Sequence, residues 1–257
     1  LLEKQVEELN KQGYETRLFR NDGKILASGW NLGIREAQGE YICRIDAHSE
    51  IMASYISTGI KCMLRPENER VAAVGGWLKH AATTRTGHVI AVLLSSKFAV
   101  GNSPFRQRPD QICNSDTATC GIYRRSLFSE IGFFDEELQR NQDMVMHQKF
   151  KSGGYTFLTH PQLEIKYYVR STLGSLTKKA FGDGKWVALA GSKNFSLRHK
   201  IPYLFVLYLI MLLLVIIFRS LLLISLLGIT ILIPMTLPII LYMVLATYFA
   251  MKTKSAV

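Results

Sequence analysis

Cysteine is scarce in this chain of 257 residues, and its four thiols show no C-x-x-C spacing. Without such pairs, the sequence indicates neither a zinc site nor a dithiol redox motif. We therefore expect reduced, buried thiols at Cys43, Cys62, Cys113 and Cys120. Internal repeats are absent, and the 48% content of hydrophobic residues excludes a disordered chain.

Acidic residues are nearly absent from the second part of the chain. Residues 151–257 hold 12 Lys+Arg and 2 Asp+Glu, whereas residues 1–150 hold 19 and 18. A nucleic-acid-binding protein more often carries basic residues across its folded body, interleaved with aromatic ones. Here the basic surplus lies directly before an apolar stretch, which indicates a membrane surface as partner and argues against nucleic acid.

Charge is also missing from the C-terminal stretch, where Ile201 to Met251 contain one charged residue, Arg219. As a continuous helix these 51 residues would be roughly 76 Å long, more than twice a ~30 Å hydrocarbon core. We expect a hairpin of two spans, Tyr203–Phe218 and Leu221–Ala250. A buried hairpin of a larger soluble protein is the alternative, although such an apolar run is long for a core helix.

Prolines and flanking charges predict the topology of this stretch. Pro234 and Pro238 lie in the second run, where we expect a kink or a turn near one interface. Basic residues at both ends place both ends in the cytoplasm and require an even number of spans. They are Arg198, His199, Lys200, Lys252 and Lys254.

The chain divides into four predicted parts. They are a body (1–170), a basic amphipathic segment on the membrane surface (171–200), the transmembrane part (201–251) and a cytoplasmic tail (252–257). In the surface segment we expect Lys178, Lys179 and Lys185 to lie along the lipid headgroups.

The body alternates predicted helices and strands. Periodicity and turn residues predict helices at 1–9, 24–38, 53–64, 125–131 and 143–152, and strands at 14–19, 41–45, 71–74, 121–123, 155–158 and 163–169. This rhythm predicts an α/β fold with a mainly parallel sheet, in which ligands bind beyond the carboxyl ends of the strands. The region 80–118 is less regular, with either a helix or a loop containing a strand over 87–100, and a loop over 101–109.

Asp46 and His48 stand two residues apart just beyond a predicted strand. At this spacing a carboxylate and an imidazole can face one cation, which would neutralise a departing diphosphate. The alternative is a capping Asp before the next helix with an ordinary surface His.

Asp143 opens a predicted helix and follows Gln142. The positive end of the helix dipole keeps such a carboxylate ionised, so that it can accept a proton from a sugar hydroxyl. The alternative is a simple helix cap.

Several ordered motifs resemble family 2 glycosyltransferases. The run Asn31–Ile42 and the Asp46-Ala47-His48 that follows it resemble the donor-binding half of these enzymes. Their acceptor-binding half is similar to three later segments, Gly121–Arg125, Gly132–Glu136 and Arg140–Asp143. The loop Gly101–Arg106, the pair Gly153-Gly154 and Gly184-Lys185-Trp186 are similar to succinoglycan-type exopolysaccharide glucosyltransferases, which also carry C-terminal membrane helices.

The resemblance covers roughly residues 10–190 and implies a GT-A fold, a Rossmann-like mixed sheet flanked by helices. The implied reaction is inverting transfer from a nucleotide-sugar, with UDP-glucose as the expected donor, to a lipid-linked oligosaccharide. Asp143 is the implied base, and Asp46 with His48 the implied ligands of a divalent metal. Because imidazole is softer than carboxylate, we expect Mn²⁺ over Mg²⁺. The implied location is a bacterial inner membrane, with the catalytic domain facing the cytoplasm.

Further site residues follow from the resemblance. Asn21, Asn31 and Asp46 are expected to bind the donor, and Gln142 to orient the acceptor or the base. Three arginines are candidates for phosphate contacts, because a guanidinium matches the geometry of a phosphate: Arg106, Arg124 and Arg140. The alternative is that each is an ordinary exposed charge. Trp186 is expected either to stack on a sugar or to lie at the membrane interface.

The family pattern normally begins with two strands, carrying P-x-Y-N-E and V-D-x-S, that would precede Leu1 here. We therefore expect a sheet truncated at its N-terminal side and a nucleotide pocket without its uracil-binding Asp. This favours an alternative function, a non-catalytic, transferase-like scaffold of a polysaccharide assembly complex. A transporter is disfavoured, because the apolar stretch holds one ionisable residue.

Overall fold

The computed structural model describes residues 2–96, 100–101, 104–189, 197–222 and 227–254. Its centre is a six-stranded sheet with the order β1-β5-β3-β6-β2, in which β4 also pairs with β6. The strands are β1 Tyr41–Cys43, β2 Ser49–Ile51, β3 Val71–Ala81, β4 Cys113–Ser115, β5 Thr119–Arg124 and β6 Thr156–Tyr168. β1 stands at one end of this order and β2 at the other.

The sheet is mixed, and the expectation of a mainly parallel sheet is wrong. Only β3 and β6 pair in parallel among the described strands, whereas β1, β2, β3 and β4 each form an antiparallel pair with β5 or β6. The error has a physical cause. β2 and β4 are three-residue strands without a periodic pattern, and they return alongside β6 instead of following a crossover helix.

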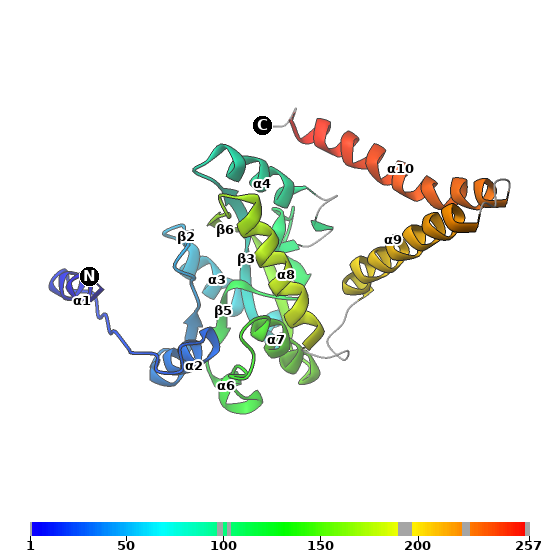
Figure 1. Ribbon diagram of the computed structural model, residues 1–257. Coiled ribbons are helices and arrows are strands. Elements are labelled where there is room, and N and C mark those ends of the chain that lie inside the picture. Colours follow the sequence, from blue (N-terminus) through cyan, green and yellow to red (C-terminus); the bar gives the residue numbers. More distant parts are fainter. Residues whose placement is uncertain (1, 97–99, 102–103, 190–196, 223–226, 255–257) are drawn as a thin grey trace.

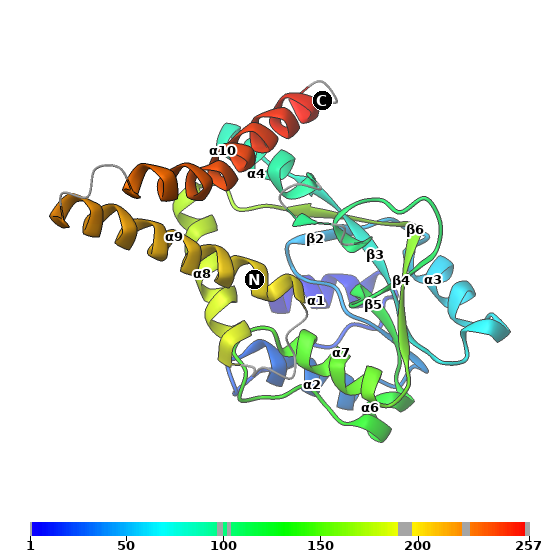
Figure 2. The same ribbon diagram turned by 90° about the vertical axis from the view of Figure 1, so that its right-hand side faces the viewer.

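Helices cover both faces of the sheet (Figures 1 and 2). The helices of the body are α1 Leu2–Lys11, α2 Leu26–Glu36, α3 Tyr55–Met63, α4 Arg85–Ser95, α6 Ser126–Ile131, α7 Gln142–Ser152 and α8 Leu173–Leu189, with short 3₁₀ turns η1 Pro66–Asn68 and η2 Pro104–Arg106. In the region left open at 87–100, α4 makes the part up to Ser95 a helix, and residues 97–99 lie outside the described residues.

Two hydrophobic cores lie on opposite faces, because successive strand residues point to opposite sides. Ala73, Tyr123 and Phe157 pack with α2, α6 and α7 in one core. Their neighbours Val74, Ile122 and Leu158 pack with α3 in the other. The rigid three-layer body therefore holds both β1 and the start of α7.

The strand expected at 14–19 is wrong. The segment from Tyr14 to Asn21 has no regular structure, and the side chains of Leu18 and Phe19 are 49% and 40% exposed. Its alternating pattern would be stable as a strand only beside another strand, and none of the described strands pairs with it. Instead, Asn10 exchanges two hydrogen bonds with Thr16 and holds the segment to the end of α1.

Two long apolar helices end the described chain, α9 Leu197–Leu222 and α10 Leu227–Lys254. They contact each other: the rings of Phe205 and Tyr242 lie 5.8 Å apart, and the Tyr208 hydroxyl donates to the Met235 carbonyl. Within the described residues, Ile201–Phe218 is the one stretch long and apolar enough to cross a membrane. The second span therefore stays a prediction.

The chain does not turn at its prolines, because α10 runs as helix through Pro234 and Pro238. The connection between α9 and α10 falls at 223–226, outside the described residues, as do residues 190–196 of the predicted surface segment and 255–257 of the tail. The side chains of the predicted flanking charges, and of Arg219, also lie outside the described part.

Candidate active site

Asp46 follows β1 at the end of the sheet. The ladder continues one residue beyond β1, since the Arg44 amide donates to the Gly121 carbonyl at 3.1 Å. The Asp46 carbonyl then accepts from the Ser49 amide at 2.9 Å and closes a turn into β2. Asp46 therefore precedes a strand and caps no helix, and its side chain is 28% exposed.

His48 lies in the same turn and is exposed. Its ring meets the ring of Tyr167 on β6 edge to face, with centroids 4.7 Å apart. The pKa of Tyr167 is raised by burial and by Asp46, and lowered by Arg170 and Arg106. Arg106 on η2 is half-buried, and its charge acts on the same Tyr167 hydroxyl as the charge of Asp46, so a phosphate contact from Arg106 stays a prediction.

Asp143 stands in the first turn of α7. The residue before that helix, Asn141, has the left-handed φ of 59°, which directs the chain into the turn. The Asp143 side chain accepts from the Met144 amide at 2.9 Å. Next to it, Gln142 is 3% exposed, and its side-chain oxygen is buried without a hydrogen-bond partner.

Arg44 links the two acids. Its Nε lies 3.9 Å from the Asp46 carboxylate, and its guanidinium carbon lies 4.1 Å from the ring centroid of Trp30. Burial alone would lower the pKa of Arg44, but Tyr123, Asp143 and Asp46 raise it above its ordinary value. The Asp46 carboxylate thus pairs with Arg44 directly, and the charge of Asp143, almost a hundred residues later in the sequence, acts on the pKa of the same guanidinium.

Two nitrogens of this guanidinium, Nε and Nη1, are buried without a hydrogen-bond partner. An unpartnered buried donor costs about 1–3 kcal/mol, and more when it is charged. Sequence reasoning missed Arg44. The signal was present, because a single charge interrupts the apolar strand Tyr41–Ile45 two residues before Asp46.

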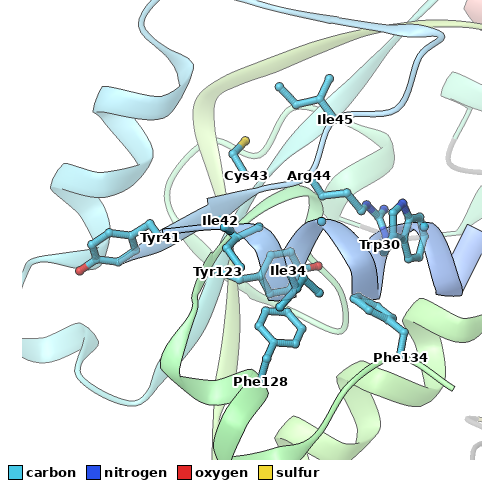
Figure 3. A pocket seen from close by; sticks show the side chains of 13 residues that line it. Trp30, Ile34, Tyr41, Ile42, Cys43, Arg44, Ile45, Tyr123, Phe128 and Phe134 are labelled. Atoms are coloured by element: carbon cyan, nitrogen blue, oxygen red, sulfur yellow. The ribbon is translucent and has the colours of Figure 1, made fainter. Parts of the chain in front are cut away.

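A cavity of about 450 Å³ lies between α2 and β1. In Figure 3 the guanidinium of Arg44 lies beside Trp30 at one end of this cavity, and aromatic rings border the rest. The lining residues are Gly29, Trp30, Gly33, Ile34, Ala37, Tyr41, Ile42, Cys43, Arg44, Ile45, Tyr123, Phe128 and Phe134. Neither Asp46 nor Asp143 lines it, so Arg44 is what connects the cavity to the two acids.

The two asparagines expected to bind the donor make structural contacts. The Asn21 amide donates to the Ile25 carbonyl at 2.7 Å and accepts from Ser28 at 2.7 Å. Asn31 is 1% exposed, and its amide exchanges hydrogen bonds of 2.8 and 2.9 Å with the Phe134 backbone. Asn31 thus joins α2 to the loop before α7, and a donor contact from either residue stays a prediction.

Arg124 makes structural contacts, and a phosphate contact from it stays a prediction. Its guanidinium donates to the carbonyls of Met63 at 2.8 Å, Asn68 at 3.2 Å and Val71 at 3.2 Å. It therefore ties the end of α3 to the sheet, on the side opposite the two acids.

Arg140 and Trp186 are both associated with α8. The Arg140 guanidinium pairs with Asp183 at 2.9 Å. Trp186 is half-buried on the same helix. Backbone carbonyls and Asp183 thus engage Arg124 and Arg140, and a phosphate contact from any of the three arginines stays a prediction.

The match to known families rests on the part of the chain that contains β1, Arg44 and Asp46. A family model described as Glycosyl transferase family 2 matches residues 2–132, more than half of the 257 residues. The chain belongs to glycosyl transferase family 2. The mixed sheet with helices on both faces is the GT-A arrangement expected for this family 2 glycosyltransferase.

A relative and two solved structures show further similarity. The relative, from Methanococcus voltae, is described as a dolichyl N-acetyl-alpha-D-glucosaminyl phosphate 3-beta-D-2,3-diacetamido-2,3-dideoxy-beta-D-glucuronosyltransferase and is 23% identical over 211 residues. The match covers 80% of this chain and 65% of the relative, so the glycosyltransferase chain spans just under two thirds of that protein's length. A crystal structure of GalNAc-T7 with UDP, GalNAc and Mn2+ aligns with a TM-score of 0.49 at 14% identity, covering 65% of this chain and 35% of that chain. The structure of S. aureus TarS 1-349 aligns with a TM-score of 0.43 at 12% identity, covering 73% and 51%.

Proposed function

We propose that this protein is a membrane-associated, inverting glycosyltransferase that moves a sugar from a nucleotide-sugar to a lipid-linked saccharide. The observation that carries the proposal is the ion pair between Arg44 and Asp46, together with the effect of Asp143 on the pKa of the same guanidinium. A metal-dependent inverting transferase uses one carboxylate to hold the cation that offsets the leaving diphosphate, and another to accept the proton of the incoming alcohol. Arg44, which pairs with Asp46 and is affected by the charge of Asp143, is the proposed connection between these two roles.

Asp143 is the proposed base. It lies in the first turn of α7, at the positive end of the helix dipole. In the reaction, the acceptor oxygen forms a bond to the anomeric carbon while the bond to the diphosphate breaks. The proton of the acceptor hydroxyl passes to Asp143.

The donor side is assigned to Asp46, His48 and Arg44. A carboxylate oxygen with an imidazole nitrogen suits Mn²⁺ better than Mg²⁺, and no third His, Cys, Asp or Glu joins them among the described residues. When bound, the cation would offset the charge that develops on the leaving diphosphate. The unpartnered N–H groups of Arg44 are the proposed donors to the same phosphate oxygens, with Arg106 in support.

The acceptor class follows from the membrane and from the relative. The relative's name describes transfer onto a dolichyl-linked sugar phosphate, and this chain has a candidate membrane span at Ile201–Phe218. A lipid-linked saccharide is therefore the proposed acceptor, with the body on the cytoplasmic face of a bacterial inner membrane. UDP-glucose as donor and exopolysaccharide synthesis as pathway are the finer parts of the proposal.

A transfer assay tests this function. The full chain is placed in lipid nanodiscs with a short lipid-linked saccharide, Mn²⁺ and UDP-[¹⁴C]glucose, and with other labelled nucleotide-sugars in parallel. We expect label in the lipid fraction with at least one donor, and inversion at the transferred anomeric carbon. Retention of configuration would contradict the assignment of Asp143 as base.

A second function has one observation in its favour. β1 lies at the end of the sheet, its residues are half-buried, and an apolar cavity adjoins it. A surface of this kind suits a transferase-like scaffold that binds another component of a polysaccharide assembly complex. Calorimetry with UDP and Mn²⁺ separates the two functions, since a scaffold would give no heat of UDP binding.

A further inference from the structure

Helix α8 has two different faces. Side chains at 175, 176, 179, 182, 183, 186 and 187 are half-buried against the body, as helical periodicity requires of a single face. The opposite face carries Lys178, Phe181 and Lys185, all exposed. Lys179 lies on the inner face and pairs with Asp183, so its expected contact with the headgroups stays a prediction that the outer-face lysines satisfy better.

The outer face suits an anionic bilayer surface. Phe181 is 77% exposed, which is unusual for an aromatic side chain that serves packing alone. Two lysines, one turn before and one turn after it, complement phospholipid headgroups. The sequence is continuous with the candidate span, since Ile201 follows Leu189 after only eleven residues.

The inner face holds the start of α7. The Asp183 carboxylate accepts from Arg140 at 2.9 Å, and the Asp183 carbonyl accepts from the Asn141 side chain at 3.1 Å. The guanidinium of Arg140 also lies against Gly182, where an added Cβ would be 3.4 Å from Nε. One turn of α8 thus contacts two consecutive residues, Arg140 and Asn141. Figures 1 and 2 show α8 running along the body.

Asn141 is the residue that sets the direction of α7. Its backbone is left-handed, with φ 59°. This conformation is unfavourable for a residue other than glycine and persists only where the surrounding contacts hold it. Asp143 follows two residues later. A displacement of α8 therefore acts directly on the geometry of the proposed base, without passing through the sheet.

We propose that Asp183 is a positioning residue that transmits the contact of α8 with an anionic bilayer to Asp143. The proposal rests on the proposed function, because it concerns the base of that reaction. According to this proposal, the enzyme reaches its highest turnover number when α8 is bound to the membrane surface, which is where a lipid-linked acceptor is found. Lys178, Phe181 and Lys185 make the lipid contact, and Asp183 with Arg140 and Asn141 makes the link to α7.

The structure also limits the size of the effect. The Arg140 and Asp183 side chains are 42% and 36% exposed, so solvent screens their pair to about 1 kcal/mol or less. A coupling of this order changes a rate or an equilibrium by about fivefold. For the same reason we expect D183N, which keeps the size of the side chain and the backbone carbonyl, to fold normally.

Hydrogen exchange measured by mass spectrometry tests the link without any substrate. The full chain is compared in nanodiscs of neutral phosphatidylcholine and in nanodiscs with one third phosphatidylglycerol. For the wild type we expect exchange at α8 and in the first turn of α7 to slow by about fivefold on anionic lipid. D183N should keep the change at α8 and lose it at α7, whereas K178Q/K185Q should lose both. K4Q/K11Q on α1, with the same loss of charge, should respond as the wild type does.

Two results would overturn the proposal: an α7 response in D183N equal to that of the wild type, or an α8 that ignores anionic lipid in the wild type. Turnover adds a second readout. We expect D183N to lower kcat on anionic lipid by about fivefold with KM for the donor unchanged, and R140Q combined with D183N to cost no more than either change alone. A chain that shows the exchange pattern but no glycosyl transfer would refute the proposed function and leave the link standing.

Discussion

Replacing Arg44 with methionine separates a binding role from a structural one. The change removes a stacking contact at 4.1 Å on Trp30 and an ion pair at 3.9 Å to a carboxylate that is 28% exposed. After solvent screening these contacts contribute about 1–2 kcal/mol to folding. Two buried nitrogens whose N–H groups have no partners oppose them by about 1–3 kcal/mol each. We therefore expect R44M to leave the free energy of unfolding unchanged or to raise it.

Donor binding should respond much more strongly to the same change. A charge-assisted hydrogen bond contributes about 1.5–3 kcal/mol. If the free N–H groups of Arg44 bind the diphosphate, R44M should weaken UDP binding by about 2–3 kcal/mol, roughly 30- to 150-fold in Kd. Calorimetric titration with UDP gives the affinity, and urea unfolding followed by circular dichroism gives the stability.

Arg35 offers a matched control. It also stacks on an aromatic ring, at 4.9 Å from the Phe133 centroid, and lies 4.0 Å from the carboxylate of Glu136, but it is 55% exposed. R35M should leave UDP binding unchanged. A destabilised R44M with wild-type UDP affinity would refute the reasoning, because it would make Arg44 a structural residue.

Three further predictions concern the donor side, a buried histidine and a close backbone approach. UDP binding of D46N is titrated with and without Mn²⁺. We expect the affinity for UDP to fall by about tenfold or more with Mn²⁺ and to change little without it. Equal losses in the two titrations would count against Asp46 as a metal ligand. Burial lowers the pKa of His147 to about 4, below the ordinary value of the unfolded chain. The unfolded state then binds more protons than the folded state below pH 6.5, so the free energy of unfolding should fall by roughly 3 kcal/mol as the pH drops from 6.5 to 4. Urea titrations at both pH values measure this fall, and H147Q should remove most of it. In G76A the new Cβ would lie 2.1 Å from the Leu163 carbonyl oxygen, and thermal unfolding should show a loss of about 3 kcal/mol, with a smaller loss arguing that β3 and β6 separate easily.

The sequence predicted the layered fold well where an element has a hydrophobic period. α2 and α3 have such periods, whereas α7 is marked by Gly153-Gly154 at its end and the core strands around Val74 and Ile122 are short apolar runs. Short strands carry no period. β2 and β4 were therefore missed, and the sheet was expected to be mainly parallel. The segment at 14–19 alternates apolar and polar residues as a strand does, but it has no neighbouring strand to pair with. The pattern within one segment cannot show whether such a neighbour exists.

The candidate site was predicted in part, for a similar reason. Asp46 and Asp143 stand at the end of a strand and the start of a helix, positions that the sequence marks. The partner of a long side chain is set by tertiary structure instead. Arg124 and Arg140 were expected at phosphates, yet backbone carbonyls and Asp183 engage them. Arg44 was missed although it carries the link between the two acids.

The central claim is that Asp143 and Asp46 serve one reaction from two sides, and D143N tests it most directly. Turnover and UDP affinity are measured on one nanodisc preparation of this variant. We expect turnover to fall by about 10²-fold or more, because a general base is lost, and the Kd for UDP to stay within about twofold. Turnover near that of the wild type, or a loss of UDP affinity as large as the loss of rate, would contradict the account.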